Sequence, residues 1–328
     1  MLTNTTEIPF FLEDNSLQSY VHSSPAFYHT PRRTILDSMS DEMLSLVSPV
    51  VAYWAYSLFF HILDCTDAPW INKYRIHESA EVKSRNLVSR WSCFFWVILQ
   101  QVVQTAFGYF WMDSSADSSS FFTDIASIRN GIVATANLFL GEEFALKFLR
   151  SYGPTAVWFA YWYAIPMAQL LFAMMCIDTW QYFLHRAFHV NKFLYRQFHS
   201  WHHRLYVPYA YGALYNHPLE GLMLDTVGAG LAHFISLMSV RQGMVLFVFS
   251  TLKTIDDHCG YRLSLDPLQM IFSNNADYHD IHHQIVGIKS NFAQPFFIHW
   301  DTLLGTRMSR KTMEERQRLS KEKKIKSS

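Results

Sequence analysis

The stretch MLSLVSPVVAYWAYSLFFHI, Met43–Ile62, contains 20 residues and no charged side chain. About 20 apolar residues are enough for an α-helix to cross the hydrocarbon core of a bilayer. Two further segments share this property, Trp91–Met112 and the uncharged run between Arg150 and Asp178. Helices buried in a protein core are the alternative, but such helices seldom stay free of charge for so long. The sequence therefore predicts three transmembrane helices in an all-α, polytopic integral membrane protein.

The composition supports this fold class. The chain has 328 residues, of which 50% are hydrophobic and only 16% are charged, against about 25% charged in a typical soluble domain. This composition argues against a disordered chain and against an ordinary soluble globule. Lysine plus arginine (27) balance aspartate plus glutamate (27), so the net charge gives no reason to expect nucleic-acid binding. Four cysteines are too few for a disulfide scaffold.

A fourth apolar region, Thr226–Leu252, is interrupted by Arg241, and neither of its two halves is long enough to span a bilayer comfortably. We expect a helical hairpin that dips into the membrane and returns. Two short complete crossings are the alternative. Both arrangements leave the two ends of the region on the same side of the membrane.

Basic residues predict the orientation. The loop Cys65–Arg90 carries five lysines and arginines, which is typical of a cytosolic loop. The N-terminus would then be lumenal, where Asn4-Thr5-Thr6 forms a possible glycosylation sequon. Three crossings place the residues after Asp178 and the basic C-terminus in the cytosol.

The expected organisation has four parts. An N-terminal segment covers residues 1–42, and transmembrane helices with their loops cover 43–177. A catalytic region, 178–306, includes the membrane hairpin 226–252 and forms a cytosolic helical cap. A charged tail covers 307–328.

Histidine is unusually frequent, with 16 residues in the chain. Three clusters stand out: His185-Arg-Ala-Phe-His189, His199-Ser-Trp-His202-His203 and His279-Asp-Ile-His282-His283. On an α-helix, residues at i, i+3 and i+4 share one face, so each cluster would present its imidazoles together. Neutral imidazole is the commonest metal ligand in proteins. Eight imidazoles are more than one ion can use, and they suit two ions with about four ligands each.

The positions of the clusters agree with the predicted topology. The first cluster follows the third span directly, and the third cluster follows the hairpin on the same side of the membrane. Zinc also binds imidazole, but structural zinc sites usually recruit cysteine. Imidazole suits iron as well, and two adjacent ions at a membrane surface indicate dioxygen chemistry on a lipid.

These histidine boxes resemble those of the integral-membrane fatty acid hydroxylase and sterol desaturase superfamily, whose members hold a di-metal centre taken as di-iron. The closer match runs from about Trp180 to Thr306. Its segment RLYVPYAYGALYNHPLEG resembles the sphingoid long-chain-base (sphinganine) C-4 hydroxylases more than the sterol oxidases.

The resemblance implies two further metal ligands, His258 in DDHCG and His217 in NHPLE. Pro218 favours an extended conformation at His217, so His217 would lie outside a helical cluster. The implied ligand set is His185, His189, His199, His202, His203, His217, His258, His279, His282 and His283. The resemblance implies no catalytic residue beyond these ligands, and it makes Trp300-Asp301 a structural turn or cap.

Several nearby residues have two interpretations. Asp178, Asp257 and Asp280 either orient the imidazoles or are surface charges. The aromatic loop Tyr206–Tyr215 either places a polar head group or packs in the core. The remaining histidines of the apolar regions and loops are expected to pack or to lie at the surface: His61, His77, His233 and His299.

By resemblance, the expected activity is a C-4 monooxygenase that converts sphinganine or dihydroceramide to phytosphingosine or phytoceramide. Two iron ions are the expected cofactors, with zinc as a substitute in the isolated protein. The sequence contains no Gly-rich dinucleotide fingerprint, so cytochrome b5 and its reductase are the expected electron donors. Lys324-Ile-Lys326-Ser-Ser resembles a retrieval signal of the endoplasmic reticulum membrane, with a solvated basic tail as the alternative.

Two other classes of function remain open. One is a related enzyme, such as a sterol methyl oxidase, a desaturase or an aldehyde-forming enzyme, because the boxes alone do not distinguish hydroxylation from desaturation. The other is a metal-binding membrane transporter or scaffold. A transporter should place ionisable ligands within its spans, whereas Met43–Ile62 contains only His61 and Trp91–Met112 contains none.

Overall fold

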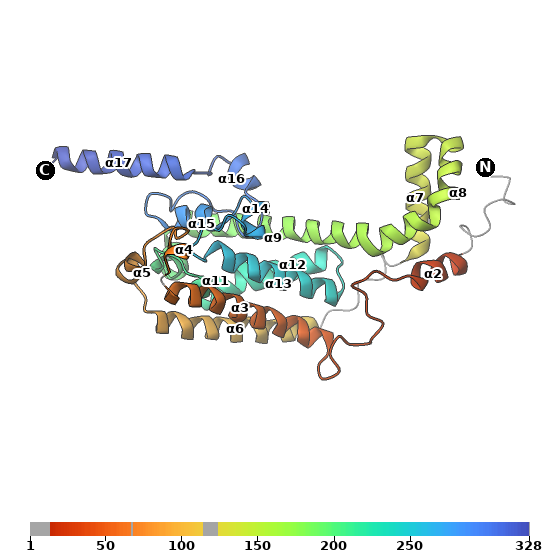
Figure 1. Cartoon of the computed structure of the whole chain (residues 1–328), viewed down its shortest axis with the longest axis horizontal. Helices are drawn as coiled ribbons and strands as arrows, with labels where there is room; N and C mark the ends of the chain where they lie inside the picture. The colour runs from red at the N-terminus through yellow and green to blue at the C-terminus, as the bar shows by residue number, and fades with distance from the viewer. Residues whose placement is uncertain (1–13, 67, 114–123, 328) are drawn as a thin grey trace.

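The structure, a computed structural model, describes residues 14–66, 68–113 and 124–327 (Figure 1). This part of the chain folds into helices and loops and contains no β-strand, only two isolated bridges. The prediction of an all-α protein is confirmed.

Three helical segments are long and apolar enough to cross a membrane. The first is α3 (Asp41–Thr66), and the second is residues Arg90–Trp111 of α6 (Arg90–Asp113). The third is the continuous run Glu142–Val190. These segments contain the three predicted spans. Less than a third of the apolar window of each is buried inside the protein, so most of each apolar surface is left for lipid to cover.

The third segment is bent. It consists of α8 (Glu142–Phe159), a π-helical turn at Ala160–Ala164, and α9 (Ile165–Val190). Sharp bends in helices commonly occur at π-type turns, where the i→i−4 hydrogen bonds are interrupted. Figure 1 shows α8 standing across the direction of α9, so only α9 runs toward the C-terminal cap.

A short apolar helix that the sequence analysis did not anticipate, α7 (Ile125–Leu140), forms a hairpin with α8. The connection is Gly141, whose φ of 75° is in the region that favours glycine. The N-terminal helix α2 (Asp14–Ser23) packs against this hairpin through Leu17 and Val21. Sixteen residues are too few to cross a bilayer comfortably, so length does not distinguish α7 as a membrane span in the sequence.

The fourth apolar region forms two helices joined by a tight turn. A π-helical turn, Leu222–Val227, leads into α12 (Gly228–Ile235), and α13 (Val240–Asp257) follows. Ser239 and Gln242 form a capping box that starts α13. The helix α12 packs on α9, and α13 packs along α3. The helix–turn–helix arrangement is as expected, and its insertion into a membrane stays a prediction.

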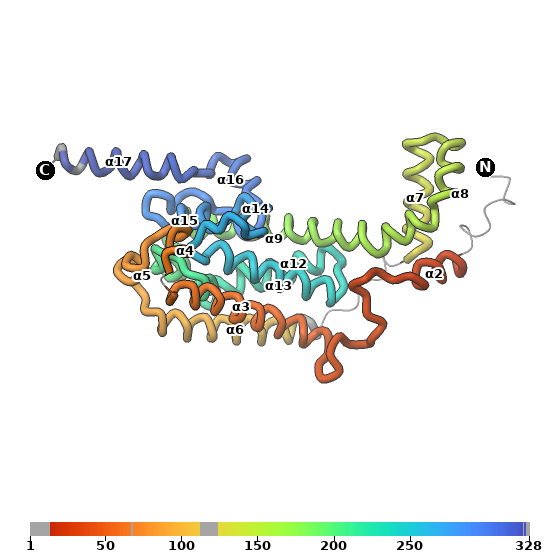
Figure 2. Tube along the Cα trace, in the orientation of Figure 1, coloured from red at the N-terminus to blue at the C-terminus, as the bar shows by residue number. Residues whose placement is uncertain are grey.

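Short elements form a cap at one end of these helices (Figure 2). They are α4 (Pro69–Asn72), α5 (Ser79–Arg85), α10 (Lys192–Leu194), α11 (Pro218–Gly221), α14 (Pro267–Ile271), α15 (Ala276–His283) and α16 (His299–Leu303). The charged helix α17 (Arg310–Ser327) extends away from this end.

A hydrophobic cluster joins the cap to the membrane-type helices. Tyr209, Tyr211 and Tyr215 are buried there against Tyr53 and Phe60 of α3. The Tyr53 hydroxyl donates a 2.8 Å hydrogen bond to the Tyr211 carbonyl. These tyrosines of the loop therefore pack in the core.

Candidate metal centre

Three parts of the cap carry the predicted boxes. His185 and His189 lie in the last turns of α9, and His279, His282 and His283 lie in α15. The second box differs from the predicted α-helix. His199 ends a π-helical turn, Tyr195–His199, and His202 begins a 3-10 turn that ends at Arg204.

The boxes come together as two groups of potential ligands. In each group the ligand atoms lie within 4.8 Å of one another. The first group contains five histidines: His185, His189, His199, His203 and His282. The second contains four: His202, His258, His279 and His283. The sequence predicted about four ligands for each ion, and the structure gives five potential ligands in one group and four in the other.

Spacing within the groups suits metal ions. In the first group, the Nε2 atoms of His185, His189 and His199 are 2.7 to 3.2 Å apart. In the second, the Nε2 atom of His279 lies 3.0 Å from those of His258 and His283. Such separations are those of nitrogen atoms that share one ion at about 2.0–2.1 Å. The two groups adjoin, because the rings of His203 and His283 have centroids 5.0 Å apart.

Backbone carbonyls orient most of the imidazoles. A carbonyl can only accept, so each of these contacts places the proton on Nδ1 and directs the Nε2 lone pair inward. The Nδ1 atoms and their acceptors are His185 to Phe292 (2.8 Å), His202 to Tyr215 (3.2 Å), His258 to Thr254 (2.7 Å), His282 to Ser290 (2.7 Å) and His283 to Leu205 (2.8 Å).

One imidazole is oriented by a carboxylate. The Nδ1 atom of His199 contacts Oε1 of Glu220, and both side chains are buried. Carboxylate–histidine pairs of this kind fix the ring and raise its basicity as a ligand. Glu220 belongs to the segment NHPLE, in which only His217 was predicted to have a role. The available signal was a carboxylate in a helix that starts at a proline just after the second box.

The three aspartates that were candidates for orienting the imidazoles form other contacts. Asp178 accepts from the backbone N–H groups of Phe296 and Phe297, and Asp257 pairs with Lys253. Asp280 accepts from Arg310 at 2.7 Å and contacts His77. These carboxylates hold the cap together, and none of their hydrogen bonds or ion pairs within the described residues involves a grouped histidine.

Burial keeps the grouped histidines neutral. It lowers the pKa of His202 to about 4 and that of His258 to about 3, because the charged imidazolium is poorly solvated there. Neutral imidazole is the form that binds metal. The fit of the residues to a metal pair therefore rests on donor identity, spacing and protonation together.

His217 is the one predicted ligand that the structure places outside both groups. It is the N-cap of α11, and its Nδ1 accepts from the Leu219 N–H at 3.3 Å. Its ring lies beside Phe198 and Trp201. The resemblance implied both His258 and His217, and geometry brings only His258 to the other histidines.

Asp301 anchors the loop that supplies one of the orienting carbonyls. Its buried carboxylate accepts from the N–H groups of Phe292 and Ala293 and from the hydroxyls of Tyr278 and Thr306. The Phe292 carbonyl in turn binds His185. The expectation of a structural role for Asp301 agrees with these contacts.

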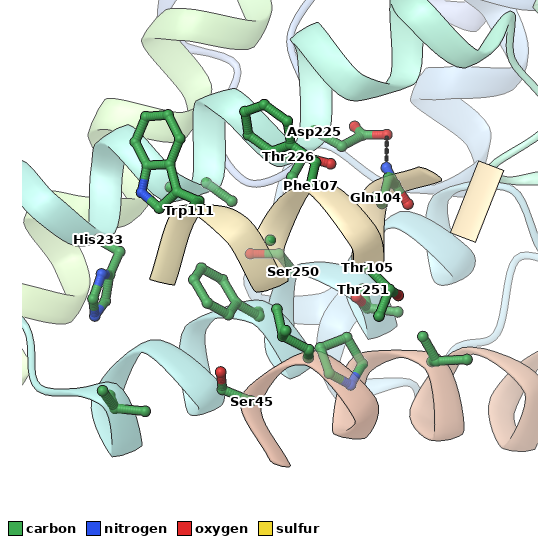
Figure 3. A pocket seen from close by; sticks show the side chains of 18 of the residues that line it. Ser45, Gln104, Thr105, Phe107, Trp111, Asp225, Thr226, His233, Ser250 and Thr251 are labelled. Atoms are coloured by element: carbon green, nitrogen blue, oxygen red, sulfur yellow. Dashed lines mark hydrogen bonds between the residues drawn. The ribbon is translucent and has the colours of Figure 1, made fainter. Parts of the chain in front are cut away.

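A cavity of about 570 Å³ lies between α3, α6, α12 and α13 (Figure 3). No grouped histidine lines the cavity, but the cavity approaches them along two helices. Gln181 on α9 and Thr254 on α13 both line it, and each stands four residues, one helical turn, before a grouped histidine, His185 and His258 respectively. The volume is in the range of pockets that hold small organic ligands.

Comparisons with known proteins agree with this site. The family model described as fatty acid hydroxylase matches residues 170–306. The sphingolipid C4-hydroxylase of Saccharomyces cerevisiae is 46% identical over 86% of this chain and 76% of its own length. Sphinganine C4-monooxygenase 1 of Arabidopsis thaliana is 42% identical over 83% of this chain and 89% of its own length.

A protein of Oryza sativa named very-long-chain aldehyde decarbonylase is 40% identical over 82% of this chain and 90% of its own length. No solved structure matches the chain. The likeness to these relatives covers the membrane-type helices as well as the cap. The chain therefore belongs to the fatty acid hydroxylase family of membrane monooxygenases, in the group that contains the sphingolipid C4-hydroxylases.

Proposed function

We propose that the protein hydroxylates C4 of a sphingoid long-chain base, sphinganine or its N-acylated form dihydroceramide, to give phytosphingosine or phytoceramide. The names of the relatives, identical at 41–46% over most of both chains, support the substrate class. The observation that carries the chemistry is the pair of adjoining histidine groups, which begin one helical turn beyond the cavity residues Gln181 and Thr254.

Nine histidines would hold two iron ions, namely the five of the first group and the four of the second. An all-imidazole donor set suits iron, and zinc would be a substitute in the isolated protein. When bound, the iron pair supplies the dioxygen activation that acid–base side chains lack, with one oxygen atom entering the C–H bond and the other leaving as water.

The chain's own residues perform the remaining tasks. The carbonyls and Glu220 hold the imidazoles in the ligating tautomer. The apolar part of the cavity wall would contact the alkyl chain, and the cavity would align one carbon of the substrate with the histidines. Asp301 fixes the loop behind His185.

The two electrons required in each turnover would come from cytochrome b5 and its reductase, acting at a cytosolic cap in the endoplasmic reticulum membrane. The basic loop before α6 and the Lys324-Ile-Lys326-Ser-Ser ending support this orientation. The Asn4 sequon lies outside the described residues. Protease digestion of sealed microsomes should remove a tag on the C-terminus and spare one on the N-terminus.

Expression in cells that lack 4-hydroxylated long-chain bases tests the function. Mass spectrometry should find phytosphingosine or phytoceramide with the wild-type chain and none with His282→Ala. A desaturated base or an oxidised sterol as the sole product would refute the proposal. The rice relative makes aldehyde conversion the second candidate, and shortened hydrocarbons in the same lipid extract would indicate it.

A further inference from the structure

The cavity extends along α13. Residues along this helix from Arg241 to Thr254 line it, a distance of about 20 Å at 1.5 Å per residue. One leaflet of a bilayer core is roughly 15 Å deep. The cavity is therefore long enough for a single extended alkyl chain between Thr254, at the end near the histidines, and Arg241, at the far end.

Apolar side chains form much of its wall, and the polar residues among them are mostly uncharged. Leu46 and Pro49 of α3, Phe107 of α6, and Phe234 and Phe247 of the hairpin line the cavity. Figure 3 shows Phe107 and Trp111 beside it, with Asp225 and Gln104 joined at one place on its wall.

Asp225 is the one acidic residue of the lining that lies away from the Arg241 end, where Asp41 and Glu42 also line the cavity. Its carboxylate oxygens accept from the Nε2 atoms of Gln104 and Gln181, each at 3.4 Å. No lysine or arginine of the described residues forms an ion pair with it, whereas Lys253 pairs with Asp257, and Arg241 at the far end pairs with Asp41.

A carboxylate in apolar surroundings is costly without a cation. Burial raises the pKa of Asp225 to about 7, because the ionised form is poorly solvated. A positively charged group bound beside it would stabilise that ionised form. Two long amide contacts alone are a weak substitute for such a partner.

Asp225 also lies close to the histidines. Its partner Gln181 precedes His185 by four residues on α9, and side chains in that relation are neighbours about 5–6 Å apart. In a long-chain base, the amine at C2 is two carbon–carbon bonds from C4. A base held at Asp225 by its amine therefore has C4 within reach of the histidine end of the cavity.

We propose that Asp225 binds the ammonium group of a free long-chain base and that this pairing positions C4 for hydroxylation. Gln104 and Gln181 flank the carboxylate, where the hydroxyl groups at C1 and C3 lie, and the alkyl chain follows α13 toward Arg241. An N-acylated base carries a neutral amide, so the cavity selects the free base. The identity of the substrate rests on the proposed function.

A binding experiment tests the charge directly, without turnover. Purified, metal-loaded enzyme in detergent is titrated with radiolabelled octadecylamine and, separately, with octadecanol. The wild-type protein should bind the amine about 10- to 100-fold more tightly, which is the usual gain from a charge-assisted contact. Equal affinities in the wild-type protein would overturn the proposal, whatever the variants do.

Variants then assign the effect to Asp225. Asp225→Asn should weaken amine binding about 10- to 100-fold and leave alcohol binding unchanged. Asp37→Asn, at an exposed aspartate of the N-terminal loop, is the matched control and should behave as wild type. Equal weakening of both probes by Asp225→Asn would indicate a structural role and refute the pairing.

Turnover separates this inference from the proposed function. With an electron donor, sphinganine should be preferred over N-acetylsphinganine, and Asp225→Asn should raise the KM for sphinganine more than it lowers kcat. Absence of any 4-hydroxylated product from wild type would refute the function, while the amine-to-alcohol ratio would still decide the role of Asp225. A preference for the N-acetylated base would refute the selection.

Discussion

His202 and His282 occupy the same position in the two H-x-x-H-H boxes, and each lies in the group formed by the other box's remaining pair. His199 and His203 share a group with His282, and His279 and His283 share one with His202. In each box the residues at i and i+4 serve one group, and the residue at i+3 serves the other. The spacing therefore builds two adjoining sites from two interlocked segments.

The interlocking makes single ligands testable. His202→Ala and His282→Ala each remove one imidazole from a different group, so each should lower the bound metal and reduce activity by at least about 100-fold, since changes in outer partners alone cost 10–100-fold. Metal analysis and product formation measure this. His217→Ala is the matched control and should keep its metal, because His217 lies outside both groups. Metal loss in the control would add His217 to the ligands.

Glu220 should matter for metal retention. Glu220→Ala removes the acceptor for Nδ1 of His199, so we expect affinity for the ion of the first group to fall about 10- to 100-fold. Glu220→Gln, which keeps an acceptor oxygen, should fall less. Competition with a chelator measures the affinity, and Glu315→Gln on the exposed surface of α17 is the control. Equal retention in wild type and Glu220→Ala would refute the role.

Removal and replacement of the metal should show which ion supports hydroxylation. Chelation should abolish activity and lower the melting temperature, because an ion that binds only the folded state stabilises it. Ferrous iron should restore both properties. Zinc should restore stability alone, since it has no redox chemistry. Recovery of hydroxylation with zinc would contradict an iron mechanism.

Asp301 is expected to be a stability residue. Asp301→Ala leaves four donors around a buried site without their acceptor, and each unsatisfied donor costs about 1–3 kcal/mol. We expect a loss of at least about 3 kcal/mol in the free energy of unfolding, measured by chemical denaturation in detergent. Asp37→Ala provides the surface comparison. A loss below about 1 kcal/mol would mean that water replaces the carboxylate.

Chain length should report on the cavity. Ala229 lines it, so Ala229→Phe should obstruct an 18-carbon base and lower kcat/KM about tenfold, in line with the cost of overpacking. A 12-carbon base should be affected less. Ala134→Phe adds the same volume at an exposed site on α7 and should leave both rates unchanged. Equal losses with both chain lengths would place the alkyl chain elsewhere.

Much of this architecture was predictable because its signals are local. Uninterrupted apolar runs indicate α3, α6 and the segment that contains α9, and histidine spacing indicates the ligands. The non-α geometry of His199–Arg204 was not predictable from the same spacing, since π and 3-10 turns there depend on tertiary packing. The choice between His258 and His217 likewise depends on where α13 ends and where α11 begins.

Long-range partners were the least predictable. Five of the acceptors that orient the imidazoles are backbone carbonyls. Every residue has a backbone carbonyl, so residue types do not indicate which ones bind a histidine. Asp178 lies in α9 before His185, and Asp257 ends α13 directly before His258, so proximity in the chain suggested contact with imidazole. The structure instead uses them to fix the backbone at Phe296 and to pair with Lys253.

One helix contributes to both the cavity and the histidine groups. Thr254 of α13 forms part of the cavity wall, and its carbonyl fixes the ring of His258 one turn later. Any displacement of α13 by an alkyl chain is therefore felt at the second group. Thermodynamic linkage makes such an influence reciprocal. Protein from which bound amphiphiles have been removed should therefore lose its metal ions to a chelator sooner than protein that retains these amphiphiles.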